Sequence, residues 1–278
     1  MVFRMVLRRS FRHLYAAAAL GGVALAPTVP ALATTPTQCP VTYQQLESAL
    51  RESVHASGGP NNGGLPVNEW AAVVNRAGQV CVVARSGAKA GDQWLGSRAI
   101  AVEKAGTANA FDLDKYAIST ANLWAASQPG GYLYGANVSN PAVPVDLYAG
   151  PLSRWGTASD PLIGETVGGV IDFAGGLGLY DRGGVVGGLG ASGNTPCADH
   201  NIAWRIREKL HLNMVPNGPS PQHNDEIVYD VGANGKSRSG WGHPQCGGLG
   251  AAQVAQVIHA GVMTTAVASA AKGGKLLR

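Results

Sequence analysis

The stretch Gly175–Trp204 constrains the fold of this chain more than any other, because it holds two short apolar runs, a turn and a helix start in close succession. The runs Gly178–Tyr180 and Val185–Val186 flank Asp181–Gly184, whose glycines supply the positive φ that a tight hairpin turn needs. The stretch therefore predicts two antiparallel strands. A helix is expected over Pro196–Leu210, since proline is favoured in the first turn of a helix.

The glycines after the second predicted strand match the spacing G-x-G-x-x-G through Gly188, Gly190 and Gly193. A dinucleotide-binding unit would also need a second parallel strand with an acidic residue about 20 positions on. Glu208 instead falls inside the predicted helix, so we reject that interpretation. We expect a loop in which the glycines let the chain leave the edge of a sheet and pack closely on a neighbour.

The first 33 residues have the features of a secretory signal. Four arginines precede a small apolar run, and Ala31-Leu32-Ala33 is an A-x-A cleavage pattern. Arg8-Arg9 also resembles the pair in a twin-arginine signal, a route for proteins that are exported after folding. The sequence predicts an exported protein, periplasmic or extracellular, whose mature chain begins at Thr34.

The mature chain is electrically neutral, because four of the 21 Lys and Arg lie in the predicted signal and the remaining 17 equal the 17 Asp and Glu. A neutral chain with scattered cations lacks the basic surface that nucleic acids or anionic membranes attract. The apolar stretch near the C-terminus contains too many polar residues to span lipid. We therefore predict no nucleic-acid partner and no membrane insertion.

The four cysteines all lie in the predicted mature chain. An even number of cysteines in an exported protein favours disulfides over metal ligation. Three pairings are open, and we prefer Cys39–Cys81 with Cys197–Cys246, because each of these bonds would join an irregular segment to a neighbouring regular element.

The rest of the chain predicts one elaborated domain over residues 34–249, followed by a helical or loosely ordered tail over residues 250–278. Apolar spacing and turn composition define its elements. We expect helices, a hairpin and a long connection in this order: helix Val41–Ala56, strands Trp70–Val74 and Val80–Ala84, helices Leu95–Phe111 and Ile118–Ser127, and connection Tyr132–Ile171.

Two patterns are distinctive: the late hairpin with its G-x-x-G-G-x-G-x-S-G run and the helix pattern K-A-x-T-A-x-x-F. Through them the chain resembles, over roughly Val41–Leu210, the haem-binding HbpS/GlcG family, which is related to the C-terminal domain of PduO-type proteins. The matching segments occur in one order: Val41–Ala56, Trp70–Arg85, the helix from Ala101 through Lys104 to Phe111, and Gly175–Gly193.

The resemblance implies a profilin-like α+β fold, in which helices pack on a central antiparallel sheet, and frequent self-assembly into homo-oligomers. It implies haem, or a related tetrapyrrole, as the ligand, with a role in haem handling or redox sensing, for which a membrane sensor would be a partner. The chain departs from the family at Cys197–Asn201 and continues about sixty residues beyond the expected end. A corrinoid or another small molecule therefore stays open as the ligand.

A haem site needs an apolar slot, partners for the propionates and usually an axial ligand. Of the histidines in the predicted mature chain we prefer His200 as the iron ligand, because it follows the glycines at a helix start and Asp199 could orient its ring. Arg205, and beside it Arg207, are candidates for the propionates. Ser192 and Tyr180 complete the predicted haem site. The other candidate ligands are His55, His211, His223, His243 and His259.

A catalytic role has less support in the sequence. Ser192 follows a strand on a glycine turn, as a hydrolase nucleophile does, but Asn194 stands where the pattern G-x-S-x-G requires its last glycine. Neither a zinc-protease H-E-x-x-H motif nor a phosphate-binding loop occurs. The sequence holds no complete catalytic motif, so a small-molecule enzyme on this fold is the alternative to a binding protein.

Overall fold

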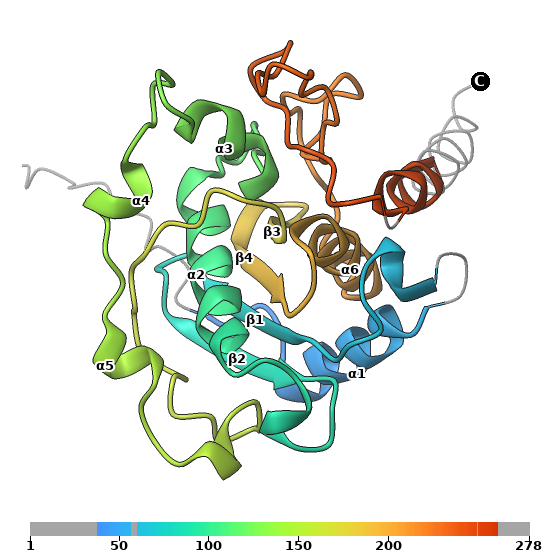
Figure 1. Ribbon diagram of the computed structural model, residues 1–278. Coiled ribbons are helices and arrows are strands. Elements are labelled where there is room, and N and C mark those ends of the chain that lie inside the picture. Colours follow the sequence, from blue (N-terminus) through green and yellow to red (C-terminus); the bar gives the residue numbers. More distant parts are fainter. Residues whose placement is uncertain (1–37, 57–59, 249, 261–278) are drawn as a thin grey trace, which may run out of the picture. The chain divides into compact units, whose positions relative to one another are not determined.

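The computed structural model describes residues 38–56, 60–248 and 250–260 (Figure 1). These residues all belong to one unit of the chain. The predicted signal over residues 1–33 and the last 18 residues of the predicted tail lie outside the described residues. None of the described helices has the length and apolarity needed to cross a bilayer.

Two hairpins form a four-stranded antiparallel sheet, which confirms the predicted α+β class. The strands β1 (Trp70–Asn75) and β2 (Val80–Arg85) form the first hairpin, and β3 (Gly176–Asp181) and β4 (Gly184–Ser192) form the second. The strand order is β2-β1-β4-β3. The two hairpins therefore meet along β1 and β4, where Val73 pairs with Leu189.

Two of the glycines that we expected in a loop, Gly188 and Gly190, instead lie within β4, one of the two central strands of the sheet, and Gly193 follows its last residue. A Cβ atom on Gly188 would come 2.1 Å from the carbonyl oxygen of Ala105, and one on Gly190 would come 2.0 Å from that of Ala101. Glycine is therefore required because a helix backbone lies directly on this strand. The prediction of close packing was right, but the prediction that the chain leaves the sheet edge here was wrong.

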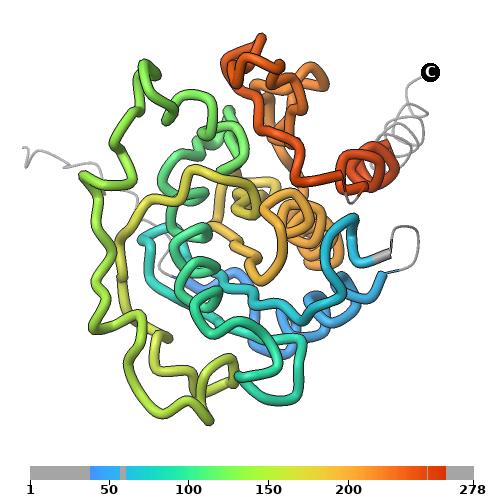
Figure 2. Tube along the Cα trace, viewed as in Figure 1, coloured from blue at the N-terminus to red at the C-terminus, as the bar shows by residue number. Residues whose placement is uncertain are grey.

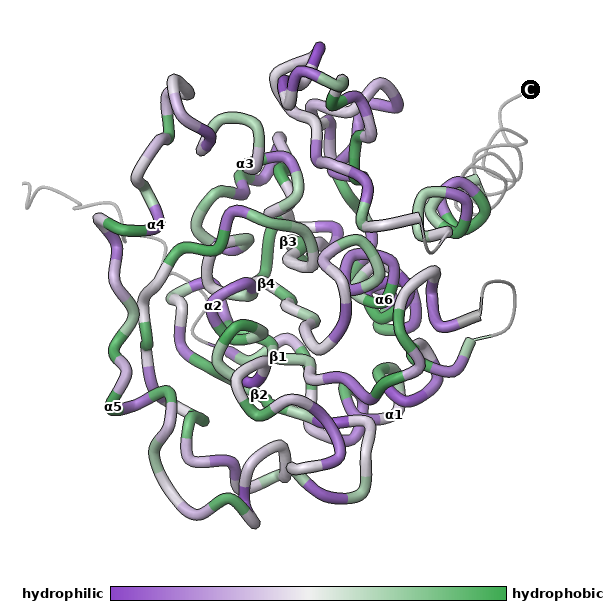
Figure 3. Tube along the Cα trace, viewed as in Figure 1, coloured by the Kyte–Doolittle hydropathy of each residue, from purple (hydrophilic) through white to green (hydrophobic). Residues whose placement is uncertain are grey.

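Helices cover both faces of the sheet (Figure 1). The helices α1 (Tyr43–Val54) and α6 (Pro196–Lys209) pack on one face, and α2 (Gly96–Phe111) packs on the other, with α3 (Thr120–Ser127) beside it. In Figure 3, β3 and β4 are drawn in green and white, in keeping with their leucines, valines and glycines. The alternation of strand residues thus places one apolar cluster under each helical layer.

The helix ends follow the signals in the sequence. Thr42 caps α1 through a capping box with Gln45, and Thr195 caps α6 one residue before Pro196. The four long helices begin and end within a few residues of their predicted bounds.

The long connection between α3 and β3 is irregular, as predicted, and contains only short helical turns. A buried ion pair holds it to α2, with the Arg98 Nε 3.0 Å from the Asp160 Oδ2. The turns in this connection are α4 (Ala136–Ser139), α5 (Pro144–Leu147) and η3 (Leu152–Arg154). Two further short helices, η1 (Pro60–Gly63) and η2 (Ala90–Asp92), lie earlier in the chain.

Residues 211–248 form an irregular C-terminal extension, which a helix over residues 251–260 follows. The tube in Figure 2 shows this helix beside α6, and the amide of Asn201 on α6 donates a hydrogen bond of 3.0 Å to the carbonyl of Ala251. The structure contains the disulfides Cys39–Cys81 and Cys197–Cys246, the pairing preferred from the sequence. The second of these bonds ties the extension to the first turn of α6.

Candidate functional site

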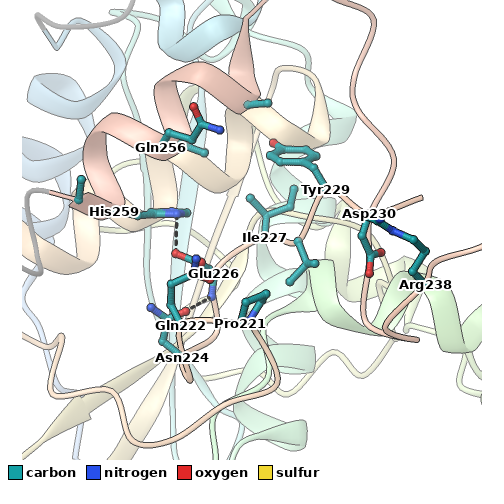
Figure 4. A pocket seen from close by; sticks show the side chains of 14 residues that line it. Pro221, Gln222, Asn224, Glu226, Ile227, Tyr229, Asp230, Arg238, Gln256 and His259 are labelled. Atoms are coloured by element: carbon teal, nitrogen blue, oxygen red, sulfur yellow. Dashed lines mark hydrogen bonds and ion pairs between the residues drawn. The ribbon is translucent and has the colours of Figure 1, made fainter. Parts of the chain in front are cut away.

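A cavity of about 620 Å³ lies between the irregular segment 221–230 and the helix over residues 251–260. This volume is within the range of small-molecule and cofactor sites. Figure 4 shows Ile227 and Tyr229 on one side of it and His259 and Gln256 on the helix side. Every lining residue belongs to the C-terminal extension or to its helix, so the extension alone provides the walls of this cavity.

The side chain of His259 has the arrangement of a metal-ligating histidine. Its Nδ1 lies 2.9 Å from the Oε2 of Glu226. A carboxylate on one ring nitrogen fixes the tautomer and leaves the other nitrogen as a lone-pair donor. The Nε2 of His259 is buried and has no hydrogen-bond partner among the described residues. The indole ring of Trp204 packs against the imidazole, with 4.2 Å between the ring centroids.

His200, the predicted iron ligand, lies deeper in the protein than His259. It is fully buried on α6, and its ring centroid is 6.2 Å from that of Trp204 and 6.3 Å from that of His259. Neither ring nitrogen has a hydrogen-bond partner in the described part of the chain. Burial, reinforced by the charges of His259 and Arg207, holds the pKa of His200 well below its ordinary value. The ring is therefore neutral, the form that can bind a metal.

Two other polar atoms close to the cavity or to His259 also lack hydrogen-bond partners in the described part of the chain. The Tyr229 hydroxyl and the Trp204 Nε1 are buried and unbonded among the residues that the structure describes. Burial raises the pKa of Tyr229, so its hydroxyl stays protonated. Arg238, on the rim, carries a positive charge beside the cavity. Buried polar groups without partners are rare in folded proteins, and a bound ligand, ion or water is what can satisfy them.

These features meet the requirements that haem sets for a protein site. The cavity is of suitable volume, its apolar walls include Ile227 and Val228, and a carboxylate-oriented histidine lines it. The exposed cation Arg238 stands where a propionate could be met. The residues present therefore fit haem as a ligand.

The model of the family described as "Haem degrading protein HbpS-like" matches residues 45–207 of the chain. The chain belongs to this HbpS-like family. Membership confirms the predicted family and, with it, haem as the class of cofactor. The matched region ends within α6, so the extension that forms the cavity lies beyond it.

Three solved structures are among those similar to this HbpS-like chain. The Klebsiella pneumoniae protein ORFY is 22% identical, covering 62% of this chain and 90% of its own, with a TM-score of 0.42. A PduOC–haem complex is 26% identical (60% and 89% covered, TM-score 0.41). A double mutant of Streptomyces reticuli HbpS is 19% identical (70% and 97% covered, TM-score 0.37). No curated protein matches the chain at a significant level.

Three elements of the family-matched region, α2, β4 and α6, meet around a buried ionic junction. The Lys104 Nζ lies 2.7 Å from the Asp199 Oδ2 and donates a second bond of 3.0 Å to the carbonyl of Ala191. The other Asp199 oxygen accepts from the backbone N–H of Asn194. We predicted that Asp199 orients His200, but both of its oxygens are engaged in this junction instead.

Glu69 completes the ionic junction at the start of β1. Its carboxyl is buried, and burial together with the negative charge of Asp199 raises its pKa well above the ordinary value. A protonated Glu69 leaves one cation and one anion, so the junction is close to neutral. The sequence analysis did not predict this junction. Its one local indication was Lys104, a charged residue among the small residues of the predicted α2 helix.

The structure does not gather the four predicted site residues into one place. Tyr180 lies opposite Val185 near the turn of the second hairpin, whereas Ser192 is at the other end of β4, about 23 Å along the strand. The Arg205 Nε donates a 2.8 Å bond to Asn62 Oδ1. Only His200 borders the residues of the cavity.

Arg207 is unavailable to a propionate, because it forms a buried bidentate pair with Asp225 of the extension, at 2.6 and 2.8 Å. Nearby, burial and the charge of Asp225 raise the pKa of Asp112 to about 8.

His259 was one of the candidate ligands in the sequence, but nothing local favoured it, because its partner Glu226 is distant from it in the sequence.

Proposed function

We propose that this protein binds haem in the cavity between the segment 221–230 and the helix over residues 251–260. The observation that carries the proposal is the family match, because it gives the class of ligand. The unpartnered nitrogen of His259 at this cavity supports the location. When bound, haem would supply an iron centre capable of redox and oxygen chemistry.

We propose a separate role in haem binding for each of four residues. His259 is proposed as the iron ligand, and Glu226 as the residue that holds its tautomer and orientation. Arg238 would meet a propionate at the rim. His200 lies behind His259 and Trp204, so we propose that it supports the site from below, with direct ligation as the alternative.

The proposed setting is an oxidising compartment outside the cytoplasm. Two disulfides support it, because such bonds persist mainly in exported proteins. The signal over residues 1–33, a twin-arginine route, a single domain over residues 34–249, assembly into homo-oligomers and a membrane-sensor partner remain parts of this proposal. Mass spectrometry of the secreted protein, with Thr34 as the expected first residue, tests the signal.

Hemin titration of the protein without residues 1–33 tests haem binding. We expect a saturable, shifted Soret band that His259→Ala removes and that His55→Ala, a substitution at an exposed histidine at the end of α1, leaves unchanged. Loss of the band in His200→Ala alone would make His200 the ligand. A spectrum equal to that of hemin with an unrelated protein would overturn the proposal, and the same titration with hydroxocobalamin would then test a corrinoid.

A further inference from the structure

Three potential metal ligands converge where the C-terminal extension meets the start of α6. Cys197, His243 and Cys246 each offer one ligand atom, and these atoms lie within 4.8 Å of one another. In the described chain this is the one group of three or more such side chains. It is separate from the proposed haem cavity, whose lining includes none of the three residues.

The imidazole of His243 faces the disulfide from the buried side. Its Nδ1 lies 3.9 Å from the Cys197 Sγ and 2.7 Å from the carbonyl oxygen of Pro244. On the other side of the ring, Nε2 accepts a long bond of 3.4 Å from the N–H of Ala174. An imidazole next to two sulfurs has the composition of a Cys₂His zinc site.

One of the two sulfur ligands lies at the start of a helix. Cys197 is in the first turn of α6, and its backbone N–H donates a bond of 3.2 Å to the Sγ of Cys246. A helix N-terminus lowers the pKa of a nearby thiol and thereby stabilises its thiolate, the form that binds metals.

Cys246 can be reached from outside. It is half-buried, whereas Cys197 and His243 are buried. A small hollow of about 70 Å³ next to Cys246 is lined by neighbours that include Gln245, Gly248 and Gln253. A reductant can therefore attack Cys246, and a cation can enter on the same side.

We propose that the Cys197–Cys246 disulfide closes a Cys₂His site, which takes a soft divalent cation of the zinc class when a dithiol reduces the bond. In the first step, the dithiol is oxidised to its own disulfide and the protein's S–S bond becomes two thiols. In the second step, one Zn²⁺ binds both sulfurs and two thiol protons are released. The ring proton of His243 moves from Nδ1 to Nε2, which gives up the bonds to Pro244 and Ala174. Nδ1 then supplies the third ligand through its lone pair, and a water can take the fourth position, as in open zinc sites.

The Cys39–Cys81 disulfide serves as the control for Cys197–Cys246. Cys39–Cys81 joins the segment before α1 to β2, and the described chain offers it no third ligand within the same distance. A variant with Cys39→Ser and Cys81→Ser therefore isolates the proposed site, and one with Cys197→Ser and Cys246→Ser removes it while keeping the other thiol pair.

The experiment measures zinc bound per chain after anaerobic reduction with a phosphine and gel filtration in the presence of Zn²⁺. For the Cys39/Cys81 variant we expect about one zinc per reduced chain and none per oxidised chain. Cobalt in place of zinc should give thiolate charge-transfer bands. His243→Ala, which keeps the disulfide, should weaken zinc binding at least about tenfold.

Folding is followed by circular dichroism in the same samples. If reduction alone unfolds the protein, zinc must restore the fold, because metal binding is coupled to folding in such sites. A folded, reduced protein that retains no zinc overturns the proposal, as does equal zinc binding by the Cys197/Cys246 variant or by His243→Ala. Hemin binding plays no part in these readouts, so either proposal can fail alone.

Discussion

Buried polar groups on the two sides of α6 differ in whether they have hydrogen-bond partners. On the family-matched side, Asp199 and Lys104 are bonded to each other and to backbone groups. On the side of the extension, His200, Trp204 and Tyr229 bury polar atoms that have no partners among the described residues. An unpartnered buried polar atom costs stability unless a ligand satisfies it. The comparison teaches that the Lys104–Asp199 pair holds elements of the matched region together, whereas the contact of α6 with the extension leaves unsatisfied groups of the kind that binding uses.

The largest loss of stability is expected where the ionic junction is broken on one side. Lys104→Met leaves Asp199 buried without its cation, which should lower the free energy of unfolding by about 3–5 kcal/mol. Chemical denaturation at neutral pH measures it, with the exposed Lys115→Met as a control near zero. Adding Asp199→Asn should recover part of the loss. An equal effect of the two lysine substitutions would refute a buried junction.

The second effect concerns the contact between β4 and α2. Gly190→Ala would put a Cβ atom 2.0 Å from the carbonyl oxygen of Ala101, and moving the helix away should cost about 1–3 kcal/mol of unfolding free energy. Gly106→Ala is the matched control, because a Cβ there meets nothing within 4 Å and alanine favours a helix by up to about 1 kcal/mol. The melting temperature should fall in Gly190→Ala and rise in Gly106→Ala. Equal shifts in the two variants would contradict close packing of α2 on β4.

A pH effect is expected where the matched core meets Asp225 of the extension. Because the pKa of Asp112 is raised to about 8 in the fold, the folded state holds a proton that the unfolded chain loses above its ordinary pKa near 4. Stability should therefore fall as pH rises between these values, by up to about 1.4 kcal/mol per pH unit. Asp112→Asn should flatten the decline seen in denaturation curves taken from pH 5 to pH 8. Parallel curves for both proteins would contradict this assignment.

The smallest expected effect compares a buried hydroxyl that has no partner with one that has a partner. Tyr229→Phe removes a buried hydroxyl that has no partner in the described chain, so the ligand-free protein should be unchanged or more stable by about 1 kcal/mol. Tyr43→Phe removes a hydroxyl that donates a 3.1 Å bond to Gly156, and it should cost about 1 kcal/mol. Thermal unfolding without hemin measures both. A loss in Tyr229→Phe equal to that in Tyr43→Phe would mean that the Tyr229 hydroxyl is satisfied.

Local signals in the sequence predicted most of the fold, because caps, turns and apolar spacing act over a few residues. Thr42 and Pro196 mark helix starts that the structure contains. The glycines of β4 misled us, since the helix backbone that requires them is about 85 positions earlier in the chain.

The candidate site was less predictable for the same physical reason. The pairing of His259 with Glu226 and that of Asp199 with Lys104 depend on how distant segments pack. Asp199 and His200 are neighbours in sequence, yet α6 directs them into different junctions. Residue type and local spacing could name the histidines but could not choose among them.

The strand order has a consequence for how the chain reaches its native state. Each hairpin joins neighbours in sequence and can form early, whereas the central seam from Val73 to Leu189 must wait until most of the chain has been made. Until then, β1 and β4 each present an open edge, and such edges invite pairing with other chains. The slow event in folding should thus be the meeting of two finished halves, and the newly made protein is most exposed to aggregation just before it.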